Sequence, residues 1–123
     1  AWIISLITIL GSSIALMNIM LVSVTERTRE IGLRKALGAK KSIIAGQFLM
    51  ETIMIGQFGG LLGIILGIGI GILISTVANF NFTTPWMAML AATAVTLIVA
   101  IIAGLFPALK AAKLDPVESL RYE

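Results

Sequence analysis

Uncharged, mostly apolar residues fill three long stretches of the chain, and charged residues gather between and after these stretches. The first covers residues 1–25 and carries no charge. The second covers residues 42–78, with Glu51 as its only charge, and the third covers residues 86–109. About 20 apolar residues are enough for a helix to cross the hydrocarbon core of a bilayer. The pattern therefore predicts an all-α membrane protein with three transmembrane helices.

A segment of very different character, residues 26–41, separates the first two stretches. It holds eight charged residues: Glu26, Arg27, Arg29, Glu30, Arg34, Lys35, Lys40 and Lys41. One charge at the centre of a membrane helix costs about 2.5 to 3.5 kcal/mol, so embedding all of them would cost on the order of 20 kcal/mol. We therefore expect this segment to lie outside the hydrocarbon.

The distribution of basic residues predicts the orientation in the membrane. The segment 26–41 and the tail 110–123 both carry lysine and arginine residues, whereas the turn at residues 79–86 carries no charge. Because basic loops stay on the cytoplasmic side, both segments and the C-terminus are expected in the cytoplasm. Trp2 and Trp86 then lie together at the outer interface, where tryptophan is enriched. Since the chain does not begin with methionine and lacks a basic leader, we expect it to be the C-terminal part of a longer polypeptide.

Composition supports a membrane protein and argues against several other classes. Hydrophobic residues make up 59% of the 123 residues and charged residues only 12%, against about 25% in soluble domains. The net charge of +3 comes from residues that flank the spans without interleaved aromatics, which argues against nucleic-acid binding. The chain has no cysteine or histidine, and residues 38–42 fail the spacing of a phosphate loop. We expect no catalytic residue, metal site or cofactor in this chain.

Small residues recur at helical spacing in all three apolar stretches and predict close helix packing. In the second stretch they form a face of glycines, which comprises Gly56, Gly60, Gly63, Gly67 and Gly71. Ala92, Thr96, Ala100 and Gly104 are spaced four apart in the third stretch, and Ser5, Thr8, Ser12 and Ala15 cluster in the first. Three interpretations remain open: packing within this chain, an interface with an identical or homologous copy, or a face along which helices slide during a transport cycle.

The charged segment predicts a short helix with an exposed apolar patch. Glu30 and Arg34 form an acid-to-base pair at the favourable spacing, and Gly38 stands where a helix would stop. Gly32 weakens this helix and predicts a bend. A small patch formed by Leu33, Ala36 and Leu37 and framed by Arg34 and Lys35 is suited to a partner's groove.

The tail and Glu51 each allow two structural interpretations. Asp115, Pro116 and Glu118 fit an N-cap, a first helical position and a capping-box acid, which predicts a second short helix, with a frayed terminus as the alternative. We expect Pro107 to bend or end the third span. Glu51 is interpreted as an interfacial or ion-paired side chain, against the alternative of a transport site.

Two strings carry a family resemblance: ERTREIGLRKALGAKKS at residues 26–42 and FPALKAAKLDPVESLRYE at residues 106–123. Together with the glycine-rich span, they resemble the C-terminal permease region of MacB/FtsX-type ABC transporters over essentially the whole chain. The resemblance implies that a further transmembrane helix and a large extracytoplasmic domain precede these three spans. It also implies a multi-pass protein of the bacterial inner membrane.

The same resemblance implies a role for the short helix after the first span. The segment would contact a cytoplasmic ABC ATPase subunit or domain, which carries the ATP and Mg, through Glu30, Ile31, Gly32, Leu33, Arg34, Lys35, Ala36, Leu37 and Gly38. Tail residues Asp115, Pro116 and Glu118 are expected to add a cytoplasmic contact. ATP hydrolysis would drive extracytoplasmic work by mechanotransmission, such as export of a drug, peptide or lipoprotein-like cargo. A second permease copy, as homodimer or heterodimer, and a periplasmic adaptor are further implied partners.

Two other functions remain as alternatives. One is an FtsX-like membrane scaffold that regulates a cell-wall hydrolase or a signalling system. The other is an ion-coupled carrier centred on Glu51, which would be expected to work without an ATPase.

Overall fold

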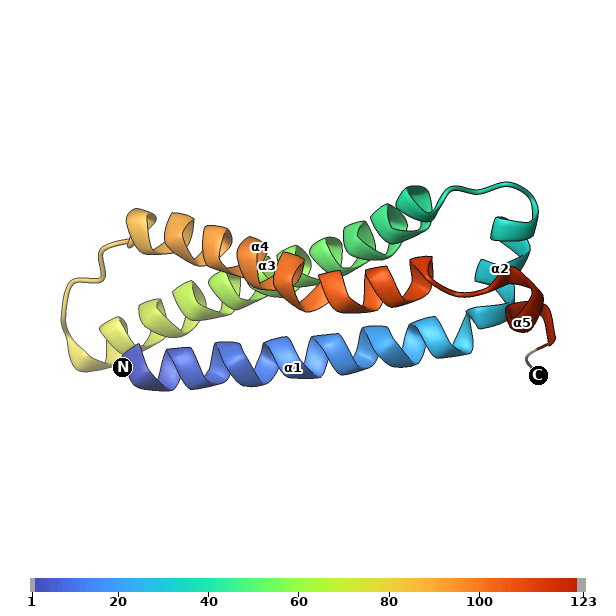
Figure 1. Ribbon diagram of the computed structural model, residues 1–123. Coiled ribbons are helices and arrows are strands. Elements are labelled where there is room, and N and C mark those ends of the chain that lie inside the picture. The colour runs from blue at the N-terminus through green and yellow to red at the C-terminus, as the bar shows by residue number, and fades with distance from the viewer. Residues whose placement is uncertain (1, 122–123) are drawn as a thin grey trace.

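The computed structural model describes residues 2–121, and this part of the chain forms five helices (Figure 1). They are α1 (Trp2–Glu26), α2 (Thr28–Ala36), α3 (Lys41–Ala78), α4 (Trp86–Ala112) and α5 (Pro116–Arg121). By length and composition, α1, α3 and α4 are able to cross a membrane. The predicted all-α class, with three candidate spans and additional short helices, is confirmed.

The short helices α2 and α5 lie together at one end of the elongated bundle, where α1 and α4 end and α3 begins (Figure 1). We call this the charged end. The opposite end, where Trp2 begins α1 and Trp86 begins α4, is the tryptophan end. With 38 residues, α3 is about 57 Å long. It exceeds the roughly 30 Å hydrocarbon core of a bilayer, so α3 must tilt or extend beyond it.

The boundary between α1 and α2 lies at Arg27, not at Gly32 as the sequence predicted. The amide of Arg27 still donates to the Ser23 carbonyl at 3.0 Å, and the Thr28 hydroxyl donates to the carbonyls of Val24 and Thr25. These bonds satisfy carbonyls that the end of α1 would otherwise leave unpaired. Gly32 lies inside α2 and is buried. Its role is therefore close packing, because the absence of a side chain lets a neighbouring helix approach.

Helix α4 continues through Pro107 to Ala112, beyond the expected end at residue 109. Proline in a helix interior removes one hydrogen bond and crowds the preceding turn. Here Pro107 is fully buried, and its neighbours Ala103, Gly104 and Ala111 are small and buried too. Close packing against the other helices holds this turn in place. Of the two outcomes expected at Pro107, an end of the span is therefore wrong, and a bend stays a prediction.

Helices α3 and α4 form the most extensive contact in the bundle, and they cross in Figure 1. Small residues line the crossing: a methyl group added to Gly104 would lie 2.7 Å from Cβ of Thr52, and one added to Gly56 would lie 2.8 Å from Cβ of Ala100. Gly60 faces Thr96, whose hydroxyl oxygen would lie 3.1 Å from an added methyl. Backbones can approach this closely only where side chains are small.

The rest of the predicted glycine face is arranged differently. A methyl group at Gly63 or Gly67 would meet no described atom within 4 Å, so both positions are open. Gly71 faces the ring of Phe82 in the connection between α3 and α4. On another side, a groove of about 380 Å³ separates α1 from the crossing and is lined by Thr8, Ser12, Gly56, Thr96 and Ala100 among others. Only the part of the glycine face near the crossing therefore packs against α4.

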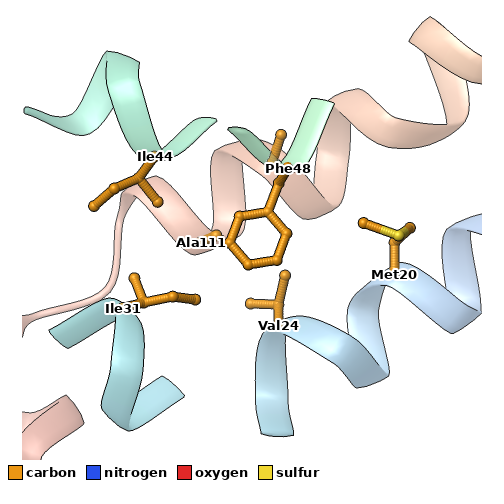
Figure 2. Packing of buried hydrophobic residues seen from close by; sticks show 7 residues of the cluster. Met20, Val24, Ile31, Ile44, Phe48 and Ala111 are labelled. Atoms are coloured by element: carbon orange, nitrogen blue, oxygen red, sulfur yellow. The ribbon is translucent and has the colours of Figure 1, made fainter. Parts of the chain in front are cut away.

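The buried apolar core lies at the charged end, where four helices meet (Figure 2). Its members are Met20 and Val24 of α1, Ile31 of α2, Ile44 and Phe48 of α3, and Ala108 and Ala111 of α4. In Figure 2 the Phe48 ring lies between the side chains of α1 and Ala111. The core therefore fixes α2 to all three candidate spans.

We predict that Phe48→Ala lowers the free energy of unfolding in detergent by about 3 to 5 kcal/mol, because it leaves a cavity where four helices meet. The matched control is Phe58→Ala on the same helix, since the Phe58 side chain is 62% exposed. Its expected effect is less than about 1 kcal/mol. Chemical unfolding of the purified protein measures both, and equal losses would contradict the assignment of the core.

Candidate functional site

The geometry of α2 follows from its sequence. The amide of Gly38 donates to the carbonyl of Lys35 and the amide of Ala39 to that of Arg34, both at 3.0 Å. This is the double hydrogen bond of a Schellman stop, and Gly38 has the positive φ of +95° that the stop requires. The predicted pair is also present, because Arg34 Nη2 lies 2.9 Å from Glu30 Oε1. Helix α2 is thus a short rod with a defined end.

Two faces of α2 meet different surroundings. Thr28, Ile31 and Gly32 are buried against the rest of the protein. Leu33 is 51% exposed and Leu37 81% exposed, and Ala36 is exposed between them. These three residues form what we call the apolar patch of α2. Exposed apolar side chains gathered on a rigid element are typical of a surface that a partner covers.

The structure corrects one feature of this patch, because Arg34 and Lys35 do not frame it. Arg34 turns toward Glu30 and donates to Gln47 of α3 at 2.7 Å. Lys35 donates through Nζ to the carbonyl oxygens of Ala112 and Leu114, where α4 ends. Both cations are used within the chain.

The predicted helix of the tail is present as α5, and the structure adds that it packs against α2. Asp115 Oδ1 accepts a hydrogen bond from the amide of Val117 at 2.9 Å, so Asp115 is the N-cap, and Pro116 is the first helical residue. Glu118 is exposed in the first turn. Cβ of Ser119 faces Gly32 so closely that a methyl group at Gly32 would overlap it. Tyr122 and Glu123 of the predicted helix lie outside the described residues.

Arg27 joins three helices at the point where α1 gives way to α2. Its Nε lies 3.2 Å from Glu30 Oε2, its Nη1 lies 3.1 Å from Glu51 Oε2 of α3, and its guanidinium lies 5.2 Å from the centre of the Phe48 ring. Burial by itself would lower the pKa of Arg27, but hydrogen bonds and attraction from Glu30 and Glu51 outweigh it and raise the pKa above its ordinary value. The interpretation of Glu51 as an ion-paired residue is confirmed, which disfavours the carrier hypothesis.

The ammonium group of Lys35 lies at the carbonyl end of α4. The last carbonyls of a helix lack partners within the helix and carry partial negative charge, so a cation there is favourable. Burial and the nearby charge of Lys41 lower the pKa of Lys35, and Asp115 partly offsets both effects. Sequence reasoning placed Lys35 in the patch but could not find this role, because its acceptors are main-chain atoms 77 and 79 residues away.

Within residues 2–121, no group of three or more acidic, histidine or cysteine side chains is placed to hold a metal ion. What the charged end offers is one short helix with an exposed apolar face and a second face joined to α1, α3, α4 and α5.

We predict that Gly32→Ala loosens α5, because the added methyl would overlap Cβ of Ser119. Overpacking of this kind costs about 1 to 3 kcal/mol. Hydrogen exchange at the amides of residues 117–121 should become faster. In the control, Gly46→Ala, the methyl points into open space, and α3 should be unchanged or more stable. Adding Ser119→Gly to Gly32→Ala should restore part of the protection. Unchanged exchange in Gly32→Ala would show that this contact does not hold α5.

Comparison with known proteins assigns the family. A family model described as FtsX-like permease C-terminal matches residues 2–116. The chain is 48% identical over 117 residues to the Bacillus subtilis protein named uncharacterized ABC transporter permease YknZ, an alignment covering 95% of this chain and 30% of the relative. It is 50% identical to a Chlorobaculum tepidum protein named macrolide export ATP-binding/permease protein MacB, over 88% of this chain and 17% of the relative. A MacB of Chlorobium luteolum is 54% identical over 88% of this chain and 16% of its own length. The chain thus spans less than a third of each of these relatives, and it belongs to the FtsX-like permease C-terminal family.

Proposed function

We propose that this chain is the membrane part of an ABC transporter that receives ATP-driven movement from a cytoplasmic ATPase and passes it to the extracytoplasmic side. The observation that carries the proposal is the apolar patch of α2. Leu33 and Leu37 are exposed on a helix whose opposite face is buried in the core of the bundle. A partner that presses on this patch therefore presses on all three candidate spans.

The printed names of the relatives support an ATPase as that partner. One is an ABC transporter permease, and others are single proteins that combine ATP binding with a permease. ATP and Mg would be bound by the ATPase subunit or domain, since this chain contributes membrane helices and a docking helix. Macrolide export belongs to the names of the relatives. For this chain we propose a cargo of the drug, peptide or lipoprotein-like class.

The charge distribution supports the orientation that the proposal needs. Arg29, Lys40, Lys41, Lys110 and Lys113 are all exposed at the charged end, which the positive-inside rule places in the cytoplasm. The C-terminus would lie there as well, in the inner membrane of a bacterium. Trp2 and Trp86, at the opposite end, would lie at the outer interface.

Further partners follow from the same proposal. A second copy of the permease, identical or related, would cover part of the apolar surface of α1 or α3, and lipid would cover the rest. Work on the outer side would pass to an extracytoplasmic domain and, in an export system, to a periplasmic adaptor.

We predict that Leu37→Asp in the full-length permease weakens ATPase binding by about tenfold or more, because a charge replaces an apolar side chain at the centre of the contact. Leu33→Asp should act in the same direction. Co-purification and permease-stimulated ATP hydrolysis measure the loss. Phe80→Asp is the matched control, since Phe80 is 52% exposed beyond α3 at the tryptophan end. If both leucine variants bind and stimulate the ATPase normally, α2 is not the docking element.

We also predict on which side of the membrane three segments lie. The chain has no cysteine, so single cysteines can be placed at Leu37, Val117 and Phe80, which are all exposed. In intact spheroplasts, a membrane-impermeant maleimide should label only the cysteine at position 80. The other two should react after lysis. Labelling of positions 37 and 117 from opposite sides would contradict the proposed topology.

A further inference from the structure

The charged end contains two sets of polar contacts that attach α2 to different spans. On one side, Arg34 donates to Gln47, and Arg27 pairs with Glu51, both of α3. On the other side, Lys35 reaches the carbonyl oxygens of Ala112 and Leu114 at the end of α4. The first set joins α2 to the start of α3, and the second joins α2 to the end of α4.

Among the polar contacts of the described residues, the attachment of α2 to α4 depends on one side chain. Arg34 and Arg27 both contact α3, whereas Lys35 donates to the two carbonyl oxygens on either side of the point where α4 ends. Apolar contacts of Ile31 in the core and the packing of α5 on α2 add to this attachment. Both acceptors of Lys35 are main-chain carbonyl oxygens, which are fixed by the path of the backbone. Unlike a carboxylate side chain, they cannot rotate away from Lys35. Asp115, which caps the start of α5, adds a favourable charge near Lys35.

Helix α5 forms a second connection between the end of α4 and α2. After α4 ends, the chain passes Lys113 and Leu114 and begins α5 at Pro116, and α5 packs on α2 through Ser119 and Gly32. The connection from α4 therefore leads to a helix that packs on α2, and Lys35 donates to two carbonyl oxygens where this connection begins. A shift of α2 along or across the membrane surface would pull on the last turn of α4 through Lys35.

We propose that Lys35 is a positioning residue that transmits movement of α2 to α4. This inference rests on the proposed function, because it takes α2 as the element that the ATPase moves. Lys35 itself lies on the half-buried side of α2, away from the exposed Leu33 and Leu37. Docking of the ATPase and transmission to α4 are therefore assigned to different side chains, and substitutions can separate them.

The experiment uses the full-length permease with its ATPase. Spin labels are placed on cysteines at Ile3 of α1 and Met87 of α4, which are 74% and 81% exposed near the tryptophan end. The distance between the labels is measured by pulsed electron resonance with and without a non-hydrolysable ATP analogue. ATPase binding is measured on the same samples, in the unsubstituted permease and in Lys35→Met, Lys35→Arg and the control Lys110→Met, whose lysine is exposed on α4.

We expect Lys35→Met to bind the ATPase normally but to lose more than half of the nucleotide-dependent distance change. Lys35→Arg should restore the change, because a guanidinium can donate to both carbonyls, and Lys110→Met should behave like the unsubstituted permease. A side chain that served only to stabilise the fold would reduce binding and distance change together. If Lys35→Met is not monodisperse, Lys35→Gln, which keeps a neutral donor, is expected to show an intermediate loss with normal binding.

A full distance change in Lys35→Met would overturn the role of Lys35 and leave the proposed docking of the ATPase on α2 intact. An unsubstituted permease that binds its ATPase without any distance change would also overturn it, since no movement would reach α4. Failure of the unsubstituted permease to bind an ATPase would instead overturn the proposed function and this inference with it.

Discussion

The cost of placing charge in hydrocarbon is the constraint on which the rest of the structure depends. Residues 26–41 cannot enter the membrane interior, so the chain must leave the bilayer between α1 and α3. The same cost keeps Lys110 and Lys113 near that surface and brings the end of α4 to the same place. The end of α1, the start of α3 and the end of α4 therefore converge at the charged end, and the short helices α2 and α5 form where water can reach them.

Close packing turns this convergence into a rigid assembly. Near the crossing of α3 and α4, small residues such as Gly56 and Gly104 let the two backbones approach. At the charged end, Phe48 and Ile31 bury apolar surface between helices that are distant in sequence. Ion pairs of Arg27 add little energy, because their side chains are about one-third to one-half exposed and such pairs contribute about 0.2 to 1 kcal/mol. These ion pairs orient α2 on the core, and burial of apolar side chains stabilises the core itself.

The two faces of α2 suit the two roles proposed for it, docking of a partner and transmission of its movement. A helix fastened on every side could not bind a partner, and a free helix could not transmit force. Here Leu37 faces outward and is 81% exposed, whereas Ile31 on the opposite side is buried in the core. Helix α1 packs against α4 less extensively than α3 does, and it has few contacts with α3, from which a groove partly separates it. Relative movement between α1 and the α3–α4 pair therefore breaks fewer contacts than movement within that pair.

Much of this architecture follows from the amino-acid sequence alone. The three spans, the short helix with its stop at Gly38, the Glu30–Arg34 pair and the capped helix at Asp115 all follow from local rules: apolar length, i,i+4 spacing and turn chemistry act over a few residues. What the tertiary structure decided involves contacts across the chain. It placed Gly32 against Ser119, kept α4 helical through Pro107, and gave Arg27 and Lys35 partners on other helices. Local sequence carries no signal for such pairings, because main-chain carbonyl groups are chemically the same at every residue. Only the fold determines which of these carbonyls a lysine can reach.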